Sequence, residues 1–175
     1  VVNLQQIVSR KAPPEIPTVL SFGKFNAPGA TNVIPQKVWL EGTFRTFDET
    51  WRAQAHEEIR NSVKGLVEAM GGTSIVDIRT GYPSLSNHKG YTAKAKTIAT
   101  SYLGKDAVED LPIRMTGEDF ALYSQLYPSV FYRLGTGFPD QDNHPVHHPR
   151  FNVNEEALSI GMEVMCLLAL TAAKK

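Results

Sequence analysis

Cysteine is almost absent from this chain. Cys166 is the only one in 175 residues, which excludes an internal disulfide and any zinc site built from several thiolates. Because it lies in an apolar run, we expect a buried and unreactive thiol. A chain without disulfides suits a reducing compartment, and the expected location is the cytoplasm.

Net charge and long apolar runs are missing as well. Eighteen basic residues balance eighteen acidic ones, so no excess charge favours a nucleic acid or an anionic membrane as a partner. The longest apolar run, from Val164 to Ala173, is about half of the ~20 residues that a membrane-spanning helix needs. With 42% hydrophobic and 21% charged residues, the composition is typical of one or two small globular domains.

The first 83 residues alternate between helix and strand patterns. They predict a short opening helix, strands over 18–25 and 32–47, a helix over 48–72 and a strand over 73–83. A capping box from Thr46 to Glu49 is expected to begin the long helix, and Gly71 with Gly72 to end it. One further strand would complete a split β-α-β unit, an antiparallel sheet with two helices on one face.

The pattern changes after residue 83. It predicts helices over 87–104 and 117–128, a strand over 129–137, a loop over 138–153 and a helix over 154–175 that Asn154 caps. This order suits the second half of an α/β sheet, so the expected fold class is α/β with domains over 1–83 and 84–175. The chain opens without methionine on a helix-interior pattern, and we expect it to be part of a longer protein.

Three of the five histidines lie in HPVHHP, residues 144–149. Imidazole is the commonest side-chain metal ligand, so this loop is a candidate metal site. His147 and His148 are adjacent and point in opposite directions on an extended chain, which disfavours shared binding of one ion. His144 and His147 can meet across a turn at Pro145, but zinc sites use three or four protein ligands. A proline-stiffened loop without a metal is the alternative interpretation.

Asn32 and Arg45 form a second candidate pair. Asn32 follows the small-residue loop APGAT, and Arg45 lies near the end of the alternating strand. Their separation of 45 − 32 = 13 positions corresponds to roughly 40 Å of extended chain at about 3.3 Å per residue. Both can serve one kind of site only if the segment folds back or if the sites lie on two subunits. A turn asparagine and a surface arginine are the alternatives.

Gly117 and His56 complete the candidates. Gly117 precedes a short helix in MTGEDF, so backbone N–H groups there can bind an anionic group of a substrate. The alternative is that Glu118 and Asp119 only complement the helix dipole. His56 lies in the middle of the long helix and is expected to be a solvated surface residue.

Five motifs follow one another along the chain: LQQIVSR, ATNVIPQKVWLEGTFRTFD, GYPSLSN, GEDFALY and VHHPRFNVNEEAL. In this order and spacing they resemble the C-terminal part of the metal-dependent amidohydrolases and metallopeptidases that include aminoacylases, hippurate hydrolase, auxin-conjugate hydrolases and glutamate carboxypeptidases. The resemblance covers nearly the whole chain. It implies that residues 1–83 are a lid, or dimerisation, domain without its first strand, and that 84–175 are the C-terminal part of the catalytic domain.

The resemblance also implies roles for single residues. His147 matches the family's last metal ligand, while His148 takes a serine position, so the choice between the two stays open. Asn32 matches a lid asparagine that helps to hold the substrate carbonyl oxygen across the dimer. Arg45 matches an arginine that binds the substrate carboxylate.

The implied reaction is hydrolysis of the amide bond of an N-acyl amino acid or a dipeptide-like substrate. It implies two divalent metal ions, with zinc expected and manganese, cobalt or nickel as alternatives. The other ligands and the catalytic glutamate have no counterpart here, so the chain alone is expected to be inactive. The implied partners are the small substrate and a second copy bound through the lid, and a non-catalytic dimerisation module is the alternative.

Overall fold

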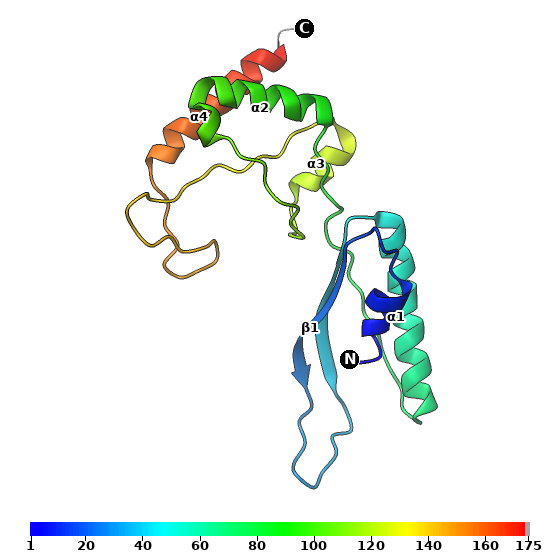
Figure 1. Ribbon diagram of the computed structural model, residues 1–175. Coiled ribbons are helices and arrows are strands. Elements are labelled where there is room, and N and C mark those ends of the chain that lie inside the picture. Colours follow the sequence, from blue (N-terminus) through cyan, green and yellow to red (C-terminus); the bar gives the residue numbers. More distant parts are fainter. Residues whose placement is uncertain (174–175) are drawn as a thin grey trace. The chain divides into compact units, whose positions relative to one another are not determined.

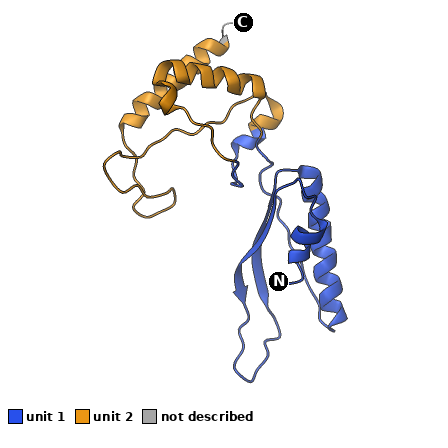
Figure 2. Ribbon diagram, in the orientation of Figure 1, with its two compact units in different colours: residues 1–85, 113–122 blue, residues 86–112, 123–175 orange. Residues whose placement is uncertain are grey.

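The computed structural model describes residues 1–173, which form two compact units. The first unit comprises Val1–Leu85 and Ile113–Leu122, and the second comprises Ser86–Pro112 and the residues from Tyr123 onward (Figure 2). The mixture of helices with an antiparallel sheet confirms the fold class expected from the sequence.

A long β-hairpin forms the sheet of the first unit (Figure 1). Strand β1 (Thr18–Asn26) pairs antiparallel with β2 (Trp39–Thr46), and the register places Thr18 opposite Thr46 and Asn26 opposite Trp39. A bulge between Phe22 and Lys24 shifts this register by one residue. The strand expected over 32–47 begins only at Trp39 and is shorter than predicted. Pro35 interrupts the segment that leads into it.

Helix α1 (Glu49–Ala69) lies beside this hairpin, and local contacts define both of its ends. The Asp48 side chain accepts a hydrogen bond from the Trp51 N–H at 2.6 Å, so Asp48 is the N-cap and the capping box expected from Thr46 is wrong. At the other end Gly71 has a φ of +78°. The Gly71 and Gly72 N–H groups donate to the carbonyls of Glu68 and Val67, which is a Schellman ending.

The core of the first unit lies between α1, β1 and the N-terminal segment. Leu4 and Ile7 come from the N-terminal turns and the short π-helix η1 (Ile7–Lys11), and Leu20 comes from β1. Trp51 is 5% exposed, and its indole N–H donates to the Thr18 hydroxyl at 3.0 Å. Burial of this apolar stripe of α1 holds the helix on the hairpin. Its buried members are Trp51, Ala55 and Ile59.

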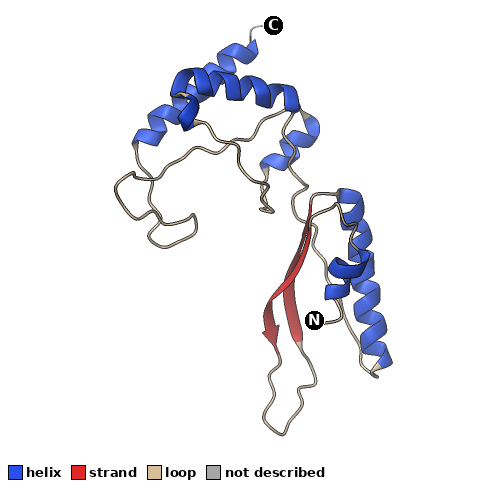
Figure 3. Cartoon of the chain, in the orientation of Figure 1, coloured by secondary structure: helices blue, strands red, loops and turns tan. Residues whose placement is uncertain are grey.

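The segment over 73–83 was expected to be a strand, but it contains no strand residue (Figure 3). Its side chains nevertheless alternate as in a strand. Val76 and Ile78 are half-buried and pack against the core, whereas Ile75 is 99% exposed. The period-two pattern was correctly recognised, but a strand also requires a hydrogen-bonded neighbour, and β1 and β2 are the only paired strands among the described residues.

The second unit is built from helices and extended chain. Its helix α2 (Lys89–Leu103) packs against α4 (Glu156–Ala173), and a short helix η2 (Lys105–Ala107) follows α2. Helix α3 (Phe120–Leu126) begins in the last residues of the first unit. Asn154 caps α4 as expected, because its side-chain oxygen accepts from the Glu156 N–H at 3.0 Å.

The strand expected over 129–137 is also absent from the described chain. In this segment, an asparagine side chain pairs with backbone polar groups that a neighbouring strand would otherwise bind. Asn87 donates to the Phe131 carbonyl and accepts from the Phe131 N–H, both at 2.8 Å. Next to it, the His88 N–H donates to the Ser129 carbonyl. These contacts join the start of α2 to the extended segment.

Cys166 is exposed, contrary to the expectation of a buried thiol. Helix α4 is apolar on several sides, but α2 is the only helix it packs against within the described chain, so most of its apolar side chains stay uncovered. None of the helices in residues 1–173 combines the length and the hydropathy needed to cross a membrane. The large apolar side chains that α4 leaves exposed are those of Leu158, Met162, Met165 and Leu170.

Candidate active-site residues

Hydrogen bonds close the histidine loop in two places, at its two ends and within it. The Asn154 N–H donates to the Thr136 carbonyl at 2.8 Å, which joins the two ends of the segment. Within it, the Asn143 side chain accepts from the Phe138 N–H and donates to the Phe138 carbonyl, both at 2.8 Å. As predicted, residues 138–153 contain neither helix nor strand.

His147 lies in a tight turn at the far end of this loop. The His148 N–H donates to the Pro145 carbonyl at 3.1 Å, and His147, at the third position, has a φ of +73°. These are the marks of a type II turn, in which glycine or asparagine is preferred at that position. His147 is the only described non-glycine residue with a positive φ, and such a backbone costs on the order of 1–3 kcal/mol.

The histidine that meets His144 is His148, not His147. Their rings stack with centroids 4.3 Å apart and planes inclined by 10°. His148 is further engaged because its Nδ1 accepts from the Arg150 N–H at 3.1 Å. The expected meeting of His144 and His147 across Pro145 is therefore wrong: the turn brings the residues on either side of it together and leaves His147 between them.

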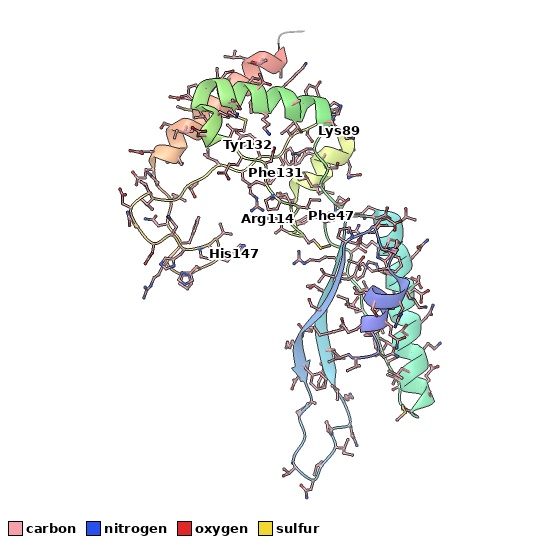
Figure 4. The ribbon with its side chains drawn as sticks, in the orientation of Figure 1. Phe47, Lys89, Arg114, Phe131, Tyr132 and His147 are labelled. Carbon is pink, nitrogen blue, oxygen red and sulfur yellow. The ribbon has the colours of Figure 1, made fainter. Side chains whose placement is uncertain are left out.

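His147 is exposed on the loop before α4 (Figure 4). Within residues 1–173 no three His, Cys, Asp or Glu side chains are grouped closely enough to hold a metal ion. A cavity of about 250 Å³ opens within the loop, lined by residues that include Asp142, His144 and Arg150, but His147 does not line it. At this loop the described chain thus offers the exposed imidazole of His147 rather than a complete metal site.

Asn32 is exposed at the tip of the β1–β2 hairpin. Ala30 and Val33 exchange two backbone hydrogen bonds of 3.1 Å, which makes Thr31 and Asn32 the two central residues of a tight turn. Gly29 allows this shape, because a Cβ there would lie 2.5 Å from the Val33 carbonyl oxygen. The turn asparagine considered from the sequence is therefore a correct description of the backbone at Asn32.

Arg45 lies at the opposite end of the same hairpin, paired with Val19. From Trp39 to Arg45, β2 alone spans roughly 20 Å at about 3.3 Å per residue, and Asn32 is seven residues beyond Trp39. The segment from Asn32 to Arg45 therefore does not fold back on itself, and the two residues lie at opposite ends of the hairpin.

The guanidinium of Arg45 reaches the segment that carries Gly117. Its Nη1 donates to the Met115 carbonyl at 2.8 Å, 70 residues along the chain. Gly117, two residues further on, is exposed. The helix that follows begins only at Phe120 and has seven residues, so its dipole is too short to make an anion site at Gly117 by itself. The structure instead places Gly117 near a positive side chain.

His56 is less solvated than expected. It is half-buried on α1, and its ring lies edge-on to Phe44 with centroids 5.9 Å apart. Burial, assisted by the charges of Arg52 and Arg60, lowers the pKa of His56 below its ordinary value of 6.5. The neutral imidazole is therefore the form that the fold favours.

Sequence reasoning did not find Asn87, Asn143 or the carbonyl of Met115. The backbone partner of Asn87 lies 44 residues away, so no local sequence pattern reveals it. The partner of Asn143 is only five residues away, but their contact depends on how the loop closes. Runs such as DQDN suggest only a polar loop. The Met115 carbonyl, the partner of Arg45, lies 70 residues away and is likewise not indicated by any local pattern.

Residues 14–171 match the description "Peptidase family M20/M25/M40". The chain belongs to this family. It is 36% identical over 168 residues to the Synechocystis protein "Probable hydrolase sll0100", covering 95% of this chain and 43% of that protein. It is 32% identical to an N-acetyldiaminopimelate deacetylase of Enterococcus faecalis, covering 92% of this chain and 42% of the relative.

A solved structure of the family has the same fold. The YXEP protein of Bacillus subtilis, described as a dinuclear metal-binding peptidase, superposes with a TM-score of 0.72 at 29% identity. The match covers 98% of this chain and 43% of the Bacillus protein. The chain thus spans less than half the length of these relatives.

Proposed function

We propose that this chain acts as the C-terminal part of a two-metal amidohydrolase that cleaves the amide bond of an N-acyl amino acid or a dipeptide-like substrate. The observation that carries the proposal is the family match over residues 14–171. Relatives named as deacetylases of N-acetyldiaminopimelate and N-acetyl-L-cysteine support this substrate class. We assign residues 1–83 to a lid and 84–175 to the catalytic domain, within a cytoplasmic protein.

The cofactor we propose is a pair of divalent ions, zinc first and manganese, cobalt or nickel as alternatives. The dinuclear relative supports the number of ions. His147 suits a terminal ligand, because its imidazole is exposed on a strained turn while the ring of His148 is stacked and hydrogen-bonded. Since no group of three ligands occurs in residues 1–173, the remaining ligands would come from other residues of the full-length protein. When bound, such ions polarise the scissile carbonyl and acidify a water molecule.

Arg45 and the segment around Gly117 would bind the substrate carboxylate. One guanidinium N–H of Arg45 is held by the Met115 carbonyl, which fixes the direction of the side chain. The four remaining N–H donors of an arginine include a pair suited to a bidentate contact with a carboxylate. Backbone N–H groups near Gly117 would add neutral donors to the same anion.

Asn32 would support the oxyanion in the active site of a partner subunit. The hairpin separates Asn32 from Arg45 along its whole length, so one extended hairpin can serve two sites of a two-fold dimer. Apolar side chains exposed towards the hairpin tip would form part of the contact between the two lids, and Ile34 is 92% exposed. Phe25, Val33 and Trp39 are exposed as well.

The experiment is a metal and activity assay on the full-length protein that contains this chain. We expect two bound ions per chain by mass spectrometry, hydrolysis of N-acetyl amino acids or hippurate, and loss of both one ion and activity in His147→Ala. The 175-residue chain alone should be inactive. A full-length protein that dimerises but binds no metal and cleaves none of these substrates would support the non-catalytic dimerisation module instead.

A further inference from the structure

The strained turn at His147 is held from both sides by contacts that involve neither metal nor substrate. On the C-terminal side, the His148 ring accepts from the Arg150 N–H, and the Phe151 N–H donates to the His148 carbonyl. On the N-terminal side, the holding residue is Asn143. Its side chain pairs with both polar groups of the Phe138 backbone at 2.8 Å and also donates to the Gln141 carbonyl at 3.3 Å.

The stacked histidines connect these two sides. His144 follows Asn143 directly, and its ring lies on that of His148, 4.3 Å away. A change in the position of residue 143 therefore displaces His144, then the stack, and finally the Pro145–His148 turn that holds His147 at a φ of +73°. Without these restraints a non-glycine residue leaves the left-handed region, because other conformations are lower in energy.

We infer that Asn143 is a positioning residue that holds the backbone of His147 in the conformation presenting its imidazole to a metal ion. This inference rests on the proposed role of His147. Asn143 acts through its amide: the oxygen accepts from Phe138, and the nitrogen donates to Phe138 and Gln141. It needs no contact with the ion, and it belongs to the residues behind the ligand that typically change metal affinity by about 10–100-fold.

Two substitutions separate this role from direct ligation. Asn143→Ala removes the whole clamp. Asn143→Asp keeps the acceptor for the Phe138 N–H but turns a second oxygen towards the carbonyls of Phe138 and Gln141, so the clamp should open as in the alanine variant. If Asn143 were itself a ligand, the aspartate would hold the ion at least as well as asparagine does.

Asn87 provides a matched control in the same unit. It makes the same pair of 2.8 Å bonds with a backbone, that of Phe131, but it is not part of the histidine loop. Asn87→Ala should therefore lower the melting temperature without a specific effect on the turn at His147. His147→Ala serves as the reference for complete loss of the ligand.

The experiment uses the full-length protein with two readouts. Amide hydrogen exchange of the apo form follows the His148 N–H, which donates within the turn. Zinc competition with a chelator measures the affinity of the protein for one zinc ion, the one that is lost in His147→Ala. We expect Asn143→Ala and Asn143→Asp to speed His148 exchange at least tenfold and to weaken that ion about 10–100-fold. Asn87→Ala should do neither.

Two results would overturn the inference. One is unchanged His148 exchange in Asn143→Ala, and the other is zinc affinity in Asn143→Asp equal to or higher than that of the wild type. Failure of the proposed function is distinguishable from both, because His147→Ala would then leave the metal content of the protein unchanged. In that case the metal role inferred for Asn143 falls with the ligand role of His147, whatever the exchange result.

Discussion

The single residues that could carry chemistry in this chain are held mostly by backbone groups. Arg45 is directed by the Met115 carbonyl, and His147 lies in a turn closed by the Pro145 carbonyl. The left-handed backbone at His147 is the clearest case, because an ordinary loop would place glycine or asparagine there. A residue kept in a conformation that disfavours it is a reason to propose a function for its side chain.

The strain at His147 can be measured by comparing two small substitutions. His147→Gly should be more stable than His147→Ala by about 1 kcal/mol, because glycine adopts a positive φ without a steric penalty. Urea unfolding of both variants gives the difference. The same pair at Val146, whose φ is not positive, should show the opposite order. Equal stability of the two His147 variants would mean that the turn is not strained.

Arg45 should matter only for substrates with a free carboxylate. In the full-length protein, Arg45→Ala should lower kcat/KM for an N-acyl amino acid, mainly by raising KM, because one partner of a charged contact is lost. The corresponding loss of transition-state stabilisation should be about 2–4 kcal/mol. The corresponding amides should be almost unaffected. Arg79→Ala is the matched control, since the Arg79 side chain is 91% exposed and its partner is Asp77 two residues away. Equal losses of kcat/KM on the acids and on the amides would contradict the role of Arg45 in binding the substrate carboxylate.

At the scale of elements, the pairing of α1 with the hairpin dominates the first unit. Trp51 and Phe44 pack edge-on with centroids 6.5 Å apart, and Phe44 also contacts the His56 ring. The Trp51 indole is hydrogen-bonded to Thr18, so helix and strand are joined by both apolar and polar contacts. This arrangement fixes the base of the hairpin, where Arg45 lies.

His56 should make the first unit less stable in acid. Its pKa is lowered by burial and by Arg52 and Arg60, so the unfolded chain binds a proton more readily than the folded one. The contribution is fully present above the ordinary pKa of 6.5 and is lost as the pH falls towards the lower pKa of the folded state. Unfolding followed by tryptophan fluorescence at several pH values should show this slope.

The control for this prediction is His56→Gln, which cannot titrate but keeps a polar side chain on α1. Its stability should depend less on pH than that of the wild type below 6.5. Glu49 and Glu57 act on the pKa of His56 in the opposite direction, so the test is run with both carboxylates intact. Identical pH slopes in the two proteins would contradict the prediction.

At the scale of the whole molecule, the chain spans less than half the length of the relatives it matches. The apolar side chains of α4 are uncovered, and the alternating segment over 73–79 has no strand neighbour within the described chain. We interpret both as faces that the rest of a full-length protein would cover.

The two-subunit arrangement predicts complementation between inactive variants. In the full-length protein, Asn32→Ala and His147→Ala homodimers should each be nearly inactive. Mixed with subunit exchange, they should regain about a quarter of wild-type activity, since half of the dimers are heterodimers and one of their two sites is intact. Mass spectrometry of labelled subunits confirms exchange. No recovery after demonstrated exchange would mean that Asn32 does not act in the partner's site.

The sequence by itself determined the elements whose hydrogen bonds are local. The bounds of α1, α2 and α4 were close to prediction, because helix bonds join residues four apart and caps such as Asn154 lie at the helix ends. The long histidine loop and the choice of Asn32, Arg45, Gly117 and His147 as candidates also came from sequence alone. Their roles stay predictions for the full-length protein.

Only the tertiary structure decided which extended segments are strands and which side chains meet. The strands predicted over 73–83 and 129–137 were wrong because pairing depends on a partner that periodicity does not reveal. The contact of Arg45 with Met115 joins residues 70 positions apart, and the stack of His144 on His148 depends on how a turn closes between them. Both follow from the path of the chain through space, which no spacing of residue types encodes.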